Sequence, residues 1–141
     1  MSDIVVDSSV VAKWILPEAD SVQAQRLVTE VAQIGDRLID LELAFTEVAN
    51  AVWKRLHRGL ATLVEARQLL DELLRSPVQM EASQRLLPAA LEIAAKYDRA
   101  IYDALFVALA QDLGLTGVTA DEPLFHAVHT DFPQIVLLRD W

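Results

Sequence analysis

Two aspartates follow short apolar runs in this 141-residue chain. Asp7 comes directly after the run 4–6, and Asp121 comes two residues after the run 115–119. Short apolar, β-branched runs predict buried strands of a parallel sheet, in which ligands bind beyond the carboxyl ends of the strands. We therefore expect both carboxylates at the same edge of one sheet. The segment around Asp7 leaves a second interpretation open, in which this residue is only the N-cap of the helix that follows.

A third acid, Asp103, is the single charged residue of the apolar run 100–110. A helix that is apolar on every side belongs inside a protein, where an ionised carboxylate costs several kcal/mol unless a partner or a metal compensates it. The dipole of the helix contributes only about 0.3–1 kcal/mol at exposed sites. Because Mg²⁺ and Mn²⁺ prefer carboxylate oxygens, we expect Asp103 to join the strand-end acids in a site for one or two divalent ions.

Strands alternate with helices along the whole chain, which predicts an α/β fold with a mostly parallel sheet. No linker, repeat or low-complexity segment divides the sequence, so we expect one domain over residues 1–141. A Thr62-Leu-Val-Glu65 capping box opens one of the helices. The expected strands are 4–6, 37–41, 78–80, 115–119 and 135–138, and the expected helices are 10–16, 20–33, 42–58, 62–76, 83–97, 100–113 and 124–128.

Composition limits the classes of function that are open to the chain. There is no cysteine, and no apolar stretch approaches the roughly 20 residues of a membrane-spanning helix, so we expect a soluble cytoplasmic protein without a membrane partner. The net charge of −9 argues against binding nucleic acid through phosphate neutralisation alone. A hydrophobic content of 53% with a mean hydropathy of +0.27 favours an interface with a second copy or another protein.

Four short acidic motifs occur in order along nearly the whole chain. They are Val6-Asp7-Ser8-Ser9, Thr46-Glu47-Val48-Ala49-Asn50-Ala51, Tyr102-Asp103-Ala104 and Thr119-Ala120-Asp121. Together they resemble the motifs of the PIN-domain family, most closely the VapC-type ribonuclease toxins of prokaryotic toxin–antitoxin pairs. The resemblance implies a three-layer α/β/α fold with four or five strands, and a metal-dependent endoribonuclease that cleaves RNA, forms a homodimer and is held inactive by a cognate antitoxin.

The resemblance also assigns roles to residues. It places the catalytic, metal-binding role on Asp7, Glu47, Asp103 and Asp121, and a supporting hydroxyl role on Ser8 and Thr119. Taken alone, Glu47 lies opposite the apolar stripe of helix 42–58 and is typical of a solvated surface acid, so its role depends on the resemblance. The chain departs from the family at 98–100, where relatives often have a glycine-containing turn.

Basic and histidine side chains give less specific signals. Lys13, Lys54, Arg55 and Arg58 form the densest basic group near the expected site, and they are candidates for substrate backbone contacts or ordinary solvated helix charges. His126 and His129 have a spacing that could share a metal, but no acid or cysteine pattern accompanies them.

Two other functions are compatible with the acids. One is a non-catalytic PIN-like interaction module in which the carboxylates are structural. The other is an aspartate-based phosphotransfer domain, suggested by the aspartate that ends the first strand. Against phosphotransfer, the sequence after Asp7 lacks the second aspartate of the dehalogenase pattern, and no lysine follows the last strands.

Overall fold

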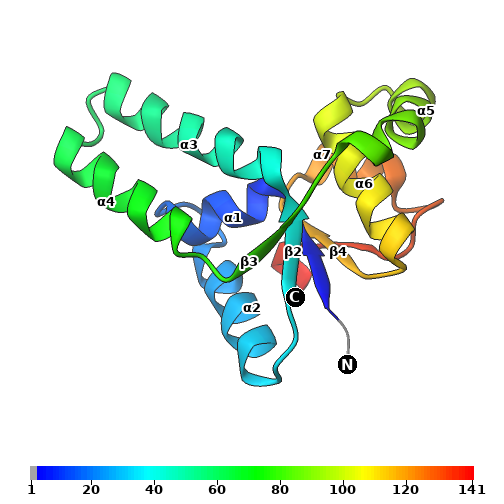
Figure 1. Ribbon diagram of the computed structural model, residues 1–141, viewed down its shortest axis with the longest axis horizontal. Coiled ribbons are helices and arrows are strands. Elements are labelled where there is room, and N and C mark those ends of the chain that lie inside the picture. Colours follow the sequence, from blue (N-terminus) through cyan, green and yellow to red (C-terminus); the bar gives the residue numbers. More distant parts are fainter. Residues whose placement is uncertain (1–2) are drawn as a thin grey trace.

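A single five-stranded sheet forms the centre of the computed structural model, which describes residues 3–141 (Figure 1). Every strand pairs in parallel with its neighbours, in the order β3-β2-β1-β4-β5, which confirms the α/β fold expected from the sequence. The strands are β1 (Ile4–Val6), β2 (Leu38–Leu41), β3 (Val78–Glu81), β4 (Gly117–Thr119) and β5 (Ile135–Leu137).

Strand β1 lies in the middle of the sheet. Val5 pairs with Ile39 of β2 on one side and with Gly117 of β4 on the other. All three residues of β1 are buried, as a central parallel strand requires when helices cover both of its faces. The carboxyl end of β1 therefore lies between the ends of two other strands.

Helices cover both faces of the sheet and complete a three-layer arrangement (Figure 1). Alternate strand residues face opposite layers: Val6 packs in the core with α1 to α4, whereas Val5 packs in the core with α5 to α7. In the described residues, no helix is both long and apolar enough to cross a membrane. The helices are α1 (Ser8–Ile15), α2 (Ser21–Gln33), α3 (Glu42–His57), α4 (Leu63–Leu74), α5 (Leu87–Tyr97), α6 (Ile101–Leu113) and α7 (Glu122–Val128).

Two helices begin earlier than the sequence predicts, because the candidate acids cap them. Helix α1 begins at Ser8 rather than at residue 10, with Asp7 as its N-cap. Helix α7 begins at Glu122 rather than at residue 124, and the Asp121 carboxylate accepts the N–H of Leu124. The predicted capping box at the start of α4 is confirmed.

The remaining boundaries differ from prediction by small amounts. The predicted helix 83–97 is a short 3₁₀ turn (Gln84–Leu86) followed by α5, with Pro88 in the first turn of α5, where its missing N–H costs no helical hydrogen bond. Asp98 ends α5 with a φ of 55°. Aspartate tolerates this left-handed conformation better than most residues, so Asp98 takes the C-cap position that glycine usually occupies.

Candidate functional site

The four acids that the sequence singles out line one pocket of about 260 Å³, together with Ser8 and Ser9. Asp7 stands at the end of β1, Asp121 follows β4, Glu47 lies in the second turn of α3 and Asp103 lies in the first turn of α6. The pocket is therefore at the carboxyl edge of the sheet, where parallel α/β folds place their ligands. Four segments that are far apart in sequence supply its carboxylates.

Asp7 is the most enclosed of the four, and its carboxylate is fixed by hydrogen bonds. Oδ1 accepts the backbone N–H of Ser8 at 2.8 Å, and Oδ2 accepts the hydroxyls of Ser9 at 3.0 Å and Thr119 at 2.8 Å. Burial raises the pKa of Asp7 despite these hydrogen bonds, and the charge of Asp121 raises it further. Asp7 is thus both a helix cap and a member of the acid pocket, so the two interpretations left open by the sequence hold together.

Glu47 is half-buried and faces the other acids. Its Oε2 lies 3.5 Å from the Ser8 hydroxyl, which donates to it. Partial burial, together with the charges of Asp7 and Asp103, raises the pKa of Glu47 to about 7. The interpretation of this residue as a solvated surface acid is wrong, because a projection of α3 alone could not show that Asp7 and Asp103 line the same pocket as Glu47.

Asp103 is less buried than the apolar run around it suggests. The fully buried part of α6 runs from Ala104 to Ala110, and Asp103 itself is half-exposed and opens into the pocket. Its pKa is raised to about 6, first by partial desolvation and then by the charges of Asp7 and Asp121. Partial burial is therefore the larger part of the energetic cost, and the neighbouring carboxylates of the same pocket add to it.

Two hydroxyl groups hold Asp7 and the loop that carries Asp121 by hydrogen bonds. Thr119 is fully buried, and its Oγ1 donates to Asp7 and accepts the N–H of Asp121 at 3.0 Å. Ser9, to which the sequence analysis assigns no role, donates to Asp7 and accepts the N–H of Ala120 at 3.0 Å. The loop after β4 is thereby tied to the start of α1.

A fifth carboxylate, Asp40, was missed from the sequence. It lies inside β2 with only 2% of its surface exposed, and by alternation it shares the face of Leu38, which α1 and α3 cover. Its Oδ1 accepts the N–H of Leu41 at 2.7 Å, and its Oδ2 has no hydrogen-bond partner within residues 3–141. Burial raises the pKa of Asp40 well above its usual value, and the nearby charges of Asp7 and Glu47 raise it further. The sequence did offer one signal for Asp40, since it is an acid within the otherwise apolar part of the predicted strand 37–41.

The donor set suits a hard divalent cation, because every candidate ligand is an oxygen and every resolved pKa shift in the pocket is upward. A bound cation would offset both the burial and the mutual repulsion that raise these pKa values. Within residues 3–141, no three histidine, aspartate or glutamate side chains are close enough together to hold one ion as they stand. The carboxylates would therefore have to move inward to coordinate a metal.

The predicted basic group does not border the acid pocket. Lys13 lies 3.6 Å from Glu18, and Lys54, Arg55 and Arg58 stand at the far end of α3 from Glu47, so none of the four is among the residues that line the pocket. Arg99, which the sequence did not suggest as a member of the basic group, lies near enough to Asp103 to offset part of the rise in the pKa of that carboxyl. It stands in the turn before α6.

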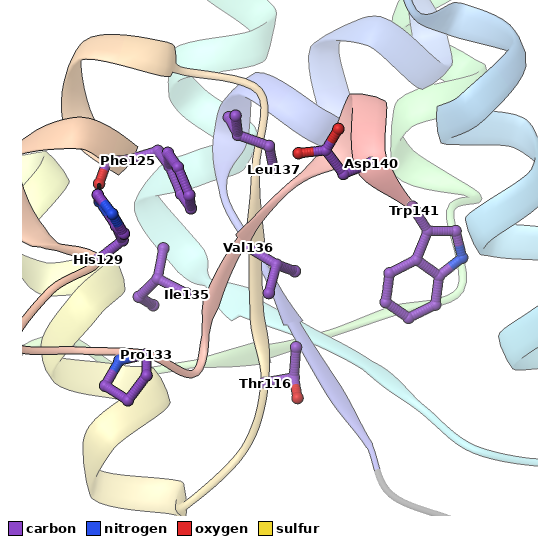
Figure 2. A pocket seen from close by; sticks show the side chains of 9 residues that line it. All are labelled: Thr116, Phe125, His129, Pro133, Ile135, Val136, Leu137, Asp140 and Trp141. Carbon is purple, nitrogen blue, oxygen red and sulfur yellow. Dashed lines mark hydrogen bonds between the residues drawn. The ribbon is translucent and has the colours of Figure 1, made fainter.

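A separate pocket of about 460 Å³ lies along β5, on the opposite side of β4 from Asp7 (Figure 2). Phe125 and His129 stack there with ring centroids 4.5 Å apart, and Nδ1 of His129 faces the carbonyl of Phe125. Asp140 is its single carboxylate, so it lacks the converging acids of the first pocket. The spacing of His126 and His129 thus reflects aromatic packing in α7.

Comparisons with known proteins agree with this arrangement. The sequence pattern of the PIN domain matches residues 4–129. Ribonuclease VapC3 of Pyrobaculum aerophilum is 37% identical over 123 residues, which cover 86% of this chain and 91% of that protein. The crystal structure of PAE2754 from the same organism has a TM-score of 0.72 at 22% identity, over 99% of this chain and 94% of that one. VapC20 of Mycobacterium tuberculosis, a toxin that cleaves the sarcin–ricin loop, has a TM-score of 0.67 at 19% identity, over 89% and 95% of the two chains.

Proposed function

The chain belongs to the PIN-domain family, and on that basis we propose that it is a metal-dependent endoribonuclease that hydrolyses RNA phosphodiester bonds. The observation that carries the proposal is the convergence of Asp7, Glu47, Asp103 and Asp121 on one pocket at the carboxyl edge of the sheet. The name of the curated relative, a ribonuclease, gives the reaction class.

In this proposal the four carboxylates hold one or two Mg²⁺ or Mn²⁺ ions. Bound ions of this kind neutralise the charge of a phosphodiester and lower the pKa of an attacking water. Thr119 and Ser9 hold Asp7 in a fixed orientation, and Ser8 links Asp7 to Glu47. Without metal the pKa of Glu47 is about 7, so metal binding near neutral pH would displace a proton from this carboxyl.

We also propose that the protein acts as the toxin of a toxin–antitoxin pair, as the names of its relatives suggest. Large apolar side chains stand exposed along α3 and α4, which pack as a hairpin (Figure 1). Such a surface suits a protein partner, either an antitoxin or a second copy of the chain. The exposed side chains are Trp53, Leu60, Leu63, Val64 and Leu74.

The test is cleavage of single-stranded RNA by the purified protein with Mg²⁺, with Mn²⁺ and with a chelator. Asp7→Asn and Asp103→Asn should each abolish cleavage while leaving the circular dichroism spectrum unchanged, because asparagine keeps the shape of the side chain and removes its charge. Asp71→Asn, which changes an exposed acid of α4 outside the pocket, is the matched control and should retain full activity. Full activity in either pocket variant would exclude the proposed mechanism, and calorimetry with Mn²⁺ would show whether the pocket binds metal at all.

A further inference from the structure

A second pocket adjoins the acid pocket and shares Glu47 with it. It has a volume of about 530 Å³ and lies between α3 and the start of α6. Its other lining residues are Leu43, Thr46 and Asn50 of α3 and Tyr102 of α6. This volume lies within the range of roughly 300–1,000 Å³ that is typical of small-molecule sites. A molecule in the acid pocket can therefore extend past Glu47 into this second space.

One stripe of α3 forms the wall of the second pocket. Positions 43, 46, 47 and 50 have the i, i+3, i+4, i+7 spacing that places side chains on a single helical face. The stripe begins with an apolar side chain and ends with the Asn50 amide, which has both hydrogen-bond donors and an acceptor. Thr46 and Asn50 are exposed, so their polar groups are available to a ligand.

Tyr102 forms the opposite wall. It directly precedes Asp103, and 60% of its surface is exposed even though it belongs to the helix with the most continuous buried run of the protein. A large aromatic ring that is exposed beside a group of carboxylates contributes nothing to the core. It presents a flat apolar surface next to the place where the proposed reaction occurs.

In the proposed function, the acid pocket holds a phosphodiester of RNA. The second pocket would then receive the nucleoside attached to that phosphate. We propose that the second pocket is a nucleobase subsite, in which the base of a nucleotide beside the scissile phosphate stacks on Tyr102 and its edge meets the Asn50 amide. Single-stranded RNA is generally recognised in this way, by stacking on aromatic rings and by hydrogen bonds to exposed base edges. The inference rests on the proposed function for the identity of the ligand, and it adds a specificity determinant on this chain.

The test uses short single-stranded RNAs with an ordinary base or an abasic ribose at each position next to the cleaved bond. Tyr102→Ala should reduce kcat/KM on the intact RNA by about 5-fold to 150-fold, the range expected when one base loses its aromatic partner. The abasic RNA should be a similarly poor substrate for the wild type and should lose little more with Tyr102→Ala. Tyr102→Phe should restore cleavage, since it keeps the ring. Asn50→Ala should change the ratio of rates between RNAs that differ only in that base.

Leu91→Ala is the matched control, because Leu91 of α5 is a large apolar side chain about as exposed as Tyr102 (63% against 60%) and lines neither pocket. Its variant should cleave both RNAs as the wild type does. If Tyr102→Ala cleaves the intact RNA at the wild-type rate, the subsite is excluded. If Tyr102→Ala instead converts an oligomer to a monomer in light scattering, this face is an interface between copies and the inference is also overturned.

Binding separates a failure of the subsite from a failure of the proposed function. Fluorescence anisotropy of the labelled RNA is measured on Asp7→Asn protein with and without Tyr102→Ala. If the wild type cleaves no RNA but Tyr102 still strengthens binding of the intact RNA over the abasic one, ribonuclease activity is excluded while the subsite is supported. If cleavage occurs but the affinity for RNA depends neither on Tyr102 nor on the presence of the base, ribonuclease activity is supported and the subsite is excluded.

Discussion

Thr119 Oγ1 donates a 2.8 Å hydrogen bond to Asp7 Oδ2, and the same oxygen accepts the N–H of Asp121 at 3.0 Å. One buried hydroxyl thus joins the ends of β1 and β4 and orients two of the four acids. Thr119→Val keeps the shape of the side chain but leaves the Asp7 oxygen and the Asp121 N–H without this partner. We expect the free energy of unfolding to fall by about 1–3 kcal/mol in urea denaturation. Thr119→Ser retains the hydroxyl and should stay closer to the wild type, and equal losses in both variants would assign the effect to packing.

The acid pocket predicts that stability without metal declines as the pH rises. Glu47 and Asp103 have folded-state pKa values of about 7 and about 6, above their ordinary values of 4.5 and 3.8. Between the ordinary and the raised values these two groups hold more protons in the folded protein than in the unfolded chain, so their contribution to stability is greatest below the ordinary pKa values and is lost as the pH rises to about 7. Melting temperatures in the presence of a chelator should show this decline, and Glu47→Gln should flatten it.

Metal should reverse that trend. Carboxylates bind Mn²⁺ in their deprotonated form, so the rise in melting temperature that Mn²⁺ causes should be small near pH 5 and large near pH 8. Differential scanning fluorimetry with Mn²⁺ or with a chelator at several pH values measures this difference. A Mn²⁺ effect that is the same in Asp7→Asn and in the wild type would place the binding outside the acid pocket.

Asp40→Asn should stabilise the protein at neutral pH. Asp40 Oδ2 is buried without a partner, and burial together with the charges of Asp7 and Glu47 raises its pKa. Asparagine keeps an oxygen for the N–H of Leu41 and removes the cost of a buried negative charge, on the order of 1–3 kcal/mol. Unfolding in urea at about pH 7.5 measures the gain, which should vanish near pH 3, below the ordinary pKa of 3.8, where the carboxyl is mostly protonated in both states. A loss of stability at both pH values would mean that the neutral amide does not fit.

Gly117 in β4 is a position where a side chain would crowd the side chains packed against the strand. A Cβ there would lie 2.9 Å from Ile135 Cδ1 and 3.0 Å from Phe106 Cζ. Gly117→Ala should therefore lower the free energy of unfolding by about 1–3 kcal/mol. Ile135→Val removes the nearest of these atoms, so the double variant should recover part of the loss. Additive losses in the double variant would exclude this steric explanation.

Much of the fold could be predicted because buried parallel strands read as unbroken apolar runs. The run 4–6 and the aspartate after it were enough to place Asp7 at the edge of the sheet. The role of Glu47 could be predicted only from the family resemblance. A helical projection shows on which face of its helix a residue lies, but not which other segments pack against that face. Asp40 was missed because its neighbours Asp7 and Glu47 come close only in the tertiary structure. The turn at Asp98 depends on a backbone conformation that residue type alone does not fix.

The order of the strands has a consequence for synthesis of the chain. β1 and β2 are made first, but one side of β1 stays open until β4 emerges from the ribosome and pairs with it. The Thr119 hydroxyl that holds Asp7, and the carboxylate of Asp121, both arrive with that strand. A nascent chain that stops before residue 119 therefore carries three of the four acids of the pocket without the strand that brings them into one place.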